Sequence, residues 1–97
     1  MCERGEDPNP CARFAINVSR SGTLRVEMQF GSSDRMFIYM YRPIPGNVVD
    51  LQNVESDQTP LVAESAVDVG VVYVQAGPYL PWGRPGDVSF RLLATLR

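Results

Sequence analysis

Residues Phe14 to Phe30 read FAINVSRSGTLRVEMQF, and this stretch decides the fold class of the chain. Apolar and polar side chains alternate on both sides of a short turn signal, Ser21-Gly22. The expected inward-facing rows are Phe14, Ile16 and Val18 before the turn and Leu24, Val26, Met28 and Phe30 after it. Strict alternation is typical of a strand with one buried face, because successive side chains of a strand point to opposite faces. The stretch therefore predicts two half-buried β-strands, which we expect to pair as a hairpin.

The segments that follow Phe30 predict a central strand and an edge strand. Met36–Tyr41 is apolar on both faces, the pattern of a central strand or of a strand whose outer face is covered. We expect Arg42–Gly46 to end this strand, because its two prolines cannot donate to a central ladder. Val48–Val54 has a weaker pattern and predicts a strand at the edge of a sheet.

The second half of the chain continues the strand pattern. Leu61–Val69 has the length of a short helix, but its β-branched valines favour a strand. Val71–Gln75 is a further strand. The final strand begins at Val88 and alternates to Leu96, and Leu93 is the one apolar residue on its polar side.

These segments amount to six to eight short strands with no amphipathic helix, separated by turn signals at the spacing of a sandwich. The sequence therefore predicts an all-β fold, a two-sheet antiparallel β-sandwich that is jelly-roll-like or Ig-like. Ninety-seven residues make one domain of this kind. We expect residues 12–97 to form the sandwich and residues 1–11, which are polar and turn-rich, to form an irregular N-terminal arm.

The composition excludes several functional classes. The chain has no histidine and all nine of its basic residues are arginine, so it can build neither a Ser–His–Asp triad nor a catalytic lysine. A pair of carboxylates is the catalytic pattern that stays open, and we expect a protein that is not an enzyme and holds no cofactor. The arginines are scattered and the net charge is −2, which does not indicate a nucleic-acid-binding face. The apolar runs are far shorter than the ~20 residues of a transmembrane helix.

Two cysteines, Cys2 and Cys11, lie in the N-terminal arm with eight residues between them. We expect them to form a disulfide that holds the arm, as cysteine pairs do in exported proteins. Two alternatives stay open. The thiols remain unpaired in one, and in the other Cys2 is the acylated first residue of a bacterial lipoprotein. The disulfide and the lipid anchor both place the protein outside the cytoplasm, in the periplasm or the extracellular space.

A proline- and glycine-rich loop, AGPYLPWGRPGD at residues 76–87, holds the candidate binding residues Tyr79, Trp82 and Arg84. Trp82 is the only tryptophan of the chain. Rings of this kind stack on sugars or fill a pocket of a protein partner, and prolines reduce the entropy lost on binding. The alternative is a structural one, in which Trp82 and Leu80 fold back as a lid over the end of the sandwich.

Two other groups of side chains are candidates for binding. Phe37, Tyr39 and Tyr41 share one face of a predicted central strand, where they form either an aromatic binding face or part of the core. The acidic and amide residues of the arm and loops offer oxygen ligands for Ca²⁺, but their spacing is not that of a calcium-binding loop. They are Glu3, Glu6, Asp7, Asn9, Asp34, Asp50, Glu55 and Asp57. We expect these charges to be solvated and to form no metal site.

The order of these segments resembles the bacterial pre-peptidase C-terminal domain family. FAINVSRSGTLRVEMQF is similar to the strand, Ser/Gly turn and strand of that family, and SSDRMFIYMYRP to its motif of an Asp before an aromatic strand. VDVGVVYVQAG and SFRLLATL resemble its later strands. The matching residues are Asp34, Phe37, Tyr39, Gly70, Tyr73, Val74, Phe90 and Leu92. The chain departs from the family at GPYLPWGRPG, where the family has a short polar hairpin.

The resemblance implies a small β-sandwich appended to secreted proteases and other exported enzymes. It indicates a non-catalytic accessory domain of an exported bacterial protein that mediates protein interaction, folding or targeting. The expected partner is a protein or the parent exported enzyme. The alternative is a carbohydrate-binding module that binds polysaccharide through its loop aromatics.

Overall fold

The computed structural model describes residues 12–31, 35–78 and 90–97. These residues form seven β-strands and contain no helix that could cross a membrane. The strands are β1 (Ala12–Val18), β2 (Gly22–Phe30), β3 (Met36–Ile44), β4 (Asn47–Ser56), β5 (Leu61–Val67), β6 (Gly70–Pro78) and β7 (Phe90–Leu96).

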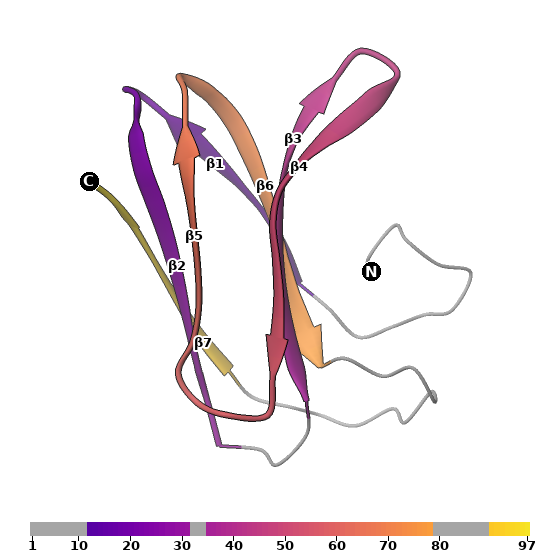
Figure 1. The fold of residues 1–97 in the computed structure, drawn as a ribbon, viewed down its shortest axis with the longest axis vertical. Helices are drawn as coiled ribbons and strands as arrows, with labels where there is room; N and C mark the ends of the chain where they lie inside the picture. Colours follow the sequence, from indigo (N-terminus) through magenta and orange to yellow (C-terminus); the bar gives the residue numbers. More distant parts are fainter. Residues whose placement is uncertain (1–11, 32–34, 79–89) are drawn as a thin grey trace.

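The strands form two antiparallel sheets that pack face to face, which confirms the predicted all-β sandwich (Figure 1). The larger sheet has the order β1-β6-β3-β4 and the smaller sheet the order β5-β2-β7. β3 is central, as its two apolar faces predict, and β4 is an edge strand. Leu61–Val67 is a strand, as its valines favour, and Val88 lies outside the described residues.

The strand order is that of a jelly roll. An immunoglobulin sandwich places its first two strands side by side in one sheet, whereas β1 and β2 here belong to opposite sheets. The pairs β1/β6, β2/β5 and β3/β4 instead nest within one another, as in a long hairpin rolled over on itself. A full jelly roll has eight strands in two sheets. The strands of the described residues have the order of the last seven strands of a jelly roll, whose first strand would pair with β7.

The predicted hairpin of the first two strands is wrong. β1 pairs with β6, and β2 pairs with β5 and β7. The short link at residues 19–21 instead carries the chain from one sheet to the other, so that the apolar faces of β1 and β2 lie on opposite sides of the core. The β3–β4 connection is the one link between consecutive strands that stays within a sheet.

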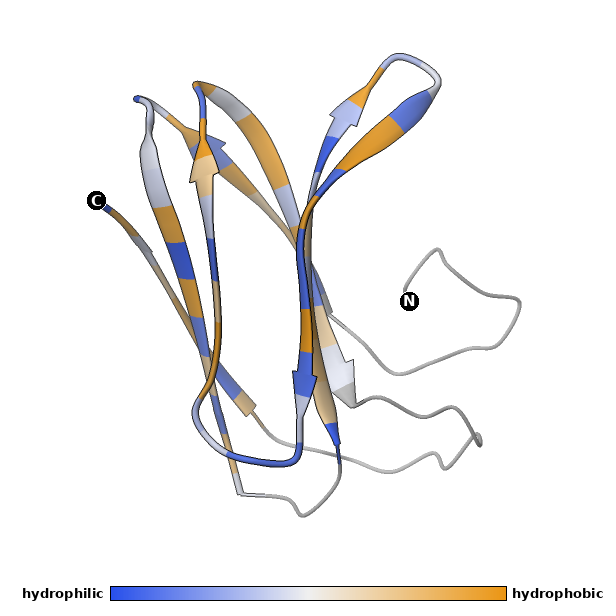
Figure 2. Ribbon diagram, viewed as in Figure 1, coloured by the Kyte–Doolittle hydropathy of each residue, from blue (hydrophilic) through white to orange (hydrophobic). Residues whose placement is uncertain are grey.

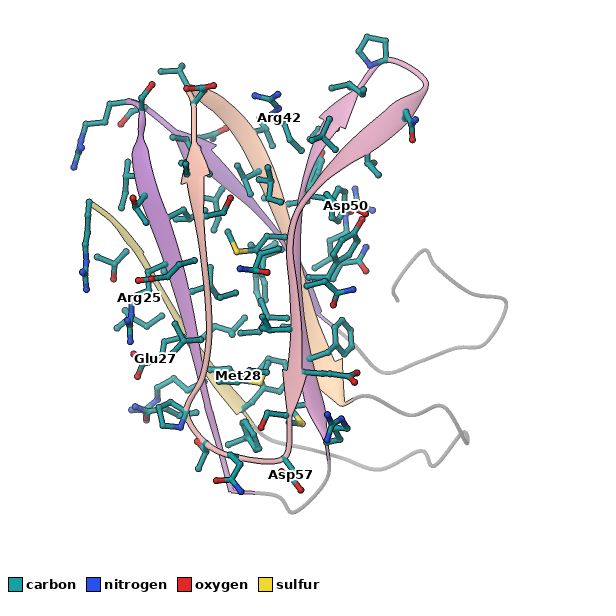
Figure 3. The ribbon with its side chains drawn as sticks, viewed as in Figure 1. Arg25, Glu27, Met28, Arg42, Asp50 and Asp57 are labelled. Carbon is teal, nitrogen blue, oxygen red and sulfur yellow. The ribbon has the colours of Figure 1, made fainter. Side chains whose placement is uncertain are left out.

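The core lies between the sheets, where the apolar residues of the alternating strands meet (Figures 2 and 3). Its buried members are Val18, Leu24, Val26, Met28, Phe30, Met36, Ile38, Met40, Leu61, Ala63, Val67, Val72, Val74 and Ala76. Figure 3 shows Met28 between the two sheets, while Arg25 and Glu27 point outward from the same strand. The inward-facing rows predicted for β2 are confirmed, and Ile16, Phe90 and Leu92 also pack against this core but are only partly buried.

The prolines after Tyr41 do not end β3, which corrects the prediction. β3 continues to Ile44, and Pro43 pairs with Val48 of β4. The ladder between β3 and β6 ends at the Tyr41–Tyr73 pair, so Pro43 has a strand on one side only. Proline is tolerated there because its missing donor is not needed on an unpaired side.

Candidate functional site

The loop and arm residues predicted from the sequence lie outside the described residues. This holds for Tyr79, Trp82 and Arg84, and for Cys2 and Cys11. The roles assigned to them above stay predictions. The described residues offer three other features for examination: an aromatic row on the larger sheet, a projecting hairpin, and an ionic network on the smaller sheet.

The aromatic row lies on the outer face of the larger sheet, away from the core. The rings of Tyr39 and Tyr41 on β3 are stacked, with centroids 4.9 Å apart. Tyr41 also contacts the ring of Tyr73 on β6, at 5.5 Å between centroids. The guanidinium carbon of Arg13 on β1 lies 4.5 Å from the centroid of the Tyr73 ring, a cation–π contact. The row therefore links β1, β6 and β3 across the sheet.

The polar atoms of this row are engaged with one another. The Tyr39 hydroxyl donates to the carboxylate of Asp50 on β4, which lies on the outer side of the sheet in Figure 3. The side-chain amide of Gln75 donates to the Tyr41 hydroxyl at 3.2 Å. Tyr39, Tyr41 and Gln75 are all buried. Buried rings with engaged hydroxyls stabilise the sheet and do not offer an open face on which a sugar could stack.

The structure therefore supports burial of the aromatic strand over an open binding face, since Tyr39 and Tyr41 are buried and Phe37 is half-buried. The inward row of β3 is Met36, Ile38 and Met40, so Tyr39 and Tyr41 are buried outside the sandwich core. The partner of Tyr39, Asp50, could not be identified from the sequence. It reaches the ring because a β-bulge shifts the β3–β4 register between Met40 and Tyr41, and such bulges change where a side chain points.

The projecting hairpin, defined here as residues 42–49, gathers three of the six exposed large apolar residues of the described chain. β3 and β4 continue past the end of the β3–β6 ladder and stand clear of the smaller sheet (Figure 1). Ile44, Val48 and Val49 are 40%, 41% and 37% exposed. Pro45 and Gly46 form the turn, and Gly46 has a φ of 75°, a conformation that favours glycine.

Both faces of the projecting hairpin carry apolar groups. Side chains of paired residues share a face, so Val48 lies beside Pro43 on one face, whereas Val49 and Ile44 lie on the other. A two-stranded ribbon is marginally stable in water by itself, and here it is continuous with the sheet. The sequence contains a signal for the hairpin, since Ile44 precedes the Pro45-Gly46 turn and two valines follow it. The prolines nevertheless led to the prediction that the strand ends earlier.

The ionic network lies on the outer face of the smaller sheet. Arg25 donates from Nη2 to Glu27 Oε1 at 3.0 Å, and its Nη1 lies 3.5 Å from Glu64 Oε2 on β5. Gln29 donates to the other oxygen of Glu27 at 3.2 Å. The hydrogen bond from Arg25, followed by that from Gln29, lowers the pKa of Glu27 below its ordinary value. The hydrogen bond to Glu27 is also the main cause that raises the pKa of Arg25.

The ion pair of Arg25 and Glu64 joins the neighbouring strands β2 and β5. Arg35 and Glu55 make a further exposed ion pair at 3.3 Å. Among residues 12–31, 35–78 and 90–97, no three acidic or cysteine side chains come close enough to hold a metal ion. Asp50 accepts from Tyr39 and Glu55 faces Arg35, so two of the loop carboxylates considered for Ca²⁺ have other described partners.

No family model, curated protein or solved structure matches this chain.

Proposed function

We propose that this domain is a non-catalytic interaction module of an exported bacterial protein, and that it binds a protein partner through the projecting hairpin. The observation that carries the proposal is the exposure of Ile44, Val48 and Val49 on a ribbon that stands clear of the sandwich. Apolar side chains gathered on an exposed element are a common mark of a protein-binding surface.

The geometry of the ribbon favours a protein over a small ligand. A small molecule binds in a concave pocket that covers most of its surface, whereas the projecting hairpin is convex and apolar on both faces. A partner that contacts both faces buries Val48 together with Ile44 and Val49. Arg42 and Asp50 flank the apolar residues and supply the polar rim typical of such interfaces.

The accessory role and the exported location are supported by the sequence. The chain has no histidine and no lysine, which leaves few ways to build a catalytic centre. Its resemblance to pre-peptidase C-terminal domains points to a module attached to, or associated with, an exported enzyme. The paired spacing of Cys2 and Cys11 is consistent with a periplasmic or extracellular location.

Polysaccharide binding is the alternative function and depends on Tyr79 and Trp82. The described aromatic residues give it less support, because the rings of Tyr39 and Tyr41 are buried and their hydroxyls are engaged. A protein partner is therefore favoured.

The proposal is tested by comparing three forms of the protein. Ile44→Thr combined with Val48→Thr removes apolar surface from the hairpin while keeping residues that favour strands. Val69→Thr is the matched control, because Val69 is an exposed apolar residue in the link between β5 and β6. Each form is immobilised and exposed to the secreted and periplasmic proteins of the source cell, and bound proteins are quantified by mass spectrometry. The same forms are applied to a polysaccharide array.

We expect a protein that binds the wild type and the Val69→Thr control, and that binds the double variant at least tenfold less. Circular dichroism confirms that all three forms are folded. Equal capture of the same proteins by all three forms would show that the hairpin is not the binding surface. Strong binding to a polysaccharide, unaffected by the double substitution, would favour the carbohydrate-binding alternative.

A further inference from the structure

The outer edge of β7 presents main-chain groups that no described strand uses. Within residues 12–31, 35–78 and 90–97, β2 is the only strand that pairs with β7. Thr23 and Arg97 exchange both main-chain hydrogen bonds, at 3.0 and 2.9 Å. Hydrogen-bonded pairs alternate along an antiparallel ladder, so Leu93 and Thr95 also bond to β2. The N–H and C=O groups of Leu92 and Ala94 therefore point away from β2, and we call these groups the β7 edge.

Among the described strands, none covers the flank of the sandwich beside the β7 edge, and we call this side the open flank. Phe14 pairs with Val74 and its side chain faces inward, yet it is 44% exposed. Ile16 and Leu92 face the core and are only partly buried. Ala94 also faces inward, through its pairing with Val26, and is exposed.

The opposite flank, between β4 and β5, is closed. The side-chain amide of Gln52 on β4 donates to the main-chain carbonyl of Glu64 on β5 at 3.1 Å, which joins the two sheets directly. Leu51 and Val54 pack against the core beside this bond. The two flanks formed by the described strands therefore differ, and the open one is the side on which a jelly roll places its first strand.

The residues around the open flank carry positive charge, which favours an acidic strand as its partner. Four of the nine arginines lie in residues 12–21 and 90–97, which contain no acidic residue. They are Arg13, Arg20, Arg91 and Arg97. Arg91 on β7 and Arg97 directly after it lie in one outward-facing row, through their pairing with Gln29 and Thr23. Arg20 donates to the carbonyl of Leu96 at 3.4 Å. An added strand beside β7 would place its own outward-facing side chains next to this row.

We propose that the β7 edge is a strand-addition site for an extended acidic segment of a protein partner. The segment runs antiparallel to β7 and completes the smaller sheet as a fourth strand. Its inward-facing side chains are apolar and cover Phe14 and Ala94. Its outward-facing side chains include carboxylates beside Arg91 and Arg97. Main-chain hydrogen bonds supply affinity in this mode of recognition, and alternate side chains supply specificity.

A second copy of the chain fits this edge less well than an acidic segment. Pairing of two β7 strands would bring Arg91 and Arg97 of each copy into one outer face without a carboxylate on either strand. Like charges placed close together on a sheet are destabilising. The site is also separate from the projecting hairpin, so it does not depend on the function proposed above.

The probe for this site is a capped, fluorescently labelled nine-residue peptide in which valine alternates with glutamate. A second peptide has lysine at every glutamate position. Binding to the domain is measured by fluorescence anisotropy at low and high salt. We expect the glutamate peptide to bind at least tenfold more tightly than the lysine peptide, and its affinity to fall as salt rises. Arg91→Glu combined with Arg97→Glu should reverse this preference, whereas Arg42→Glu on the hairpin should leave it unchanged.

Main-chain pairing is tested by two peptides that leave the domain unaltered. Residues that exchange hydrogen bonds across an antiparallel pair have side chains on the same face, so the valines of the peptide are the residues that bond Leu92 and Ala94. N-methylation of the valines should reduce binding at least tenfold, and N-methylation of the glutamates should not.

The matching substitution in the domain is Ala94→Pro, which removes the N–H donor of Ala94 from the β7 edge and leaves the hydrogen bonds between β7 and β2 in place. It should also reduce binding of the glutamate peptide at least tenfold. Equal binding of the glutamate and lysine peptides would overturn the proposal, as would indifference to valine N-methylation. Sedimentation that shows a dimer of the wild type, dissociated by Ala94→Pro, would assign the edge to a second copy instead.

Discussion

Phe14 and Val74 face each other across the β1–β6 ladder and point to the same side of the sheet, yet Phe14 is 44% exposed and Val74 is 1% exposed. Their positions in the sheet account for the difference. Val74 lies on β6, between β1 and β3, whereas Phe14 lies on the edge strand β1. The described part of the smaller sheet ends at β7, and none of its strands covers Phe14. One pair of residues thus marks the boundary between the closed core and the open flank.

Substitutions of apolar residues in the closed core should lower stability more than substitutions at the open flank. Ile38 is fully buried on the central strand β3, whereas Leu92 is partly buried on the edge strand β7. We expect Ile38→Ala to lower the free energy of unfolding by about 2–5 kcal/mol, the range for a large aliphatic residue in a core. Leu92→Ala should cost less than about 2 kcal/mol, because water already reaches its site. Urea denaturation measures both values, and a larger loss for Leu92→Ala would show that the flank is closed.

Gly22 should not tolerate a side chain. A Cβ atom placed on Gly22 would overlap the main-chain carbonyl oxygen of Arg97, at the end of the β2–β7 ladder. We expect Gly22→Ala to lower the free energy of unfolding by about 1–3 kcal/mol, because the backbone must move to relieve the overlap. Gly31→Ala is the control, since a Cβ on Gly31 has open space around it. Equal denaturation midpoints for the two variants would contradict this close approach.

The Glu27 carboxylate should make stability depend on pH in the acid range. Its pKa is lower in the folded protein because Arg25 and Gln29 donate to it. A carboxylate with a lowered pKa stabilises the folded state above its ordinary pKa of about 4.3, and the contribution is lost as pH falls through the lower, folded value. Glu27→Gln should therefore lower stability at pH 6 more than at pH 3, as measured by thermal unfolding.

The control for this prediction is Asp57→Asn, which removes a carboxylate from the exposed turn between β4 and β5. It leaves the bonds among Arg25, Glu27 and Gln29 in place. The difference in thermal stability between pH 6 and pH 3 should be smaller for Glu27→Gln than for the wild type. An equal difference in the two proteins would show that the Glu27 carboxylate does not contribute.

Local alternation was sufficient to predict the inward-facing residues of the strands. Val26, Ile38 and Val72 lie in the core, as the two-residue period required. Alternation carries no information on which strands pair, however, because β1 has the same pattern whether its neighbour is β2 or β6. The short link after Val18 suggested a hairpin, whereas β1 pairs with β6 and lies in the opposite sheet from β2.

The candidate surfaces were harder to predict, for reasons that are also physical. The contact between Tyr39 and Asp50 depends on a β-bulge, and no residue type in the sequence indicates that bulge. The projecting hairpin was not predicted because proline is excluded from a strand that has a neighbour on each side. Pro43 has a neighbouring strand, β4, on one side only, so the strand continues through it. The exposure of Leu93, which broke the predicted alternation of β7, follows from its place on the outer face of the smaller sheet.

Amide hydrogen exchange along β7 tests the unpaired edge most directly. We expect an alternating pattern in the free domain, because Leu93 and Thr95 donate to β2 and Leu92 and Ala94 do not. The amides of Leu93 and Thr95 should be protected, and those of Leu92 and Ala94 should exchange orders of magnitude faster, at rates close to those of exposed loop amides. Equal protection of all four amides would contradict the account, since it would mean that a strand already occupies the β7 edge.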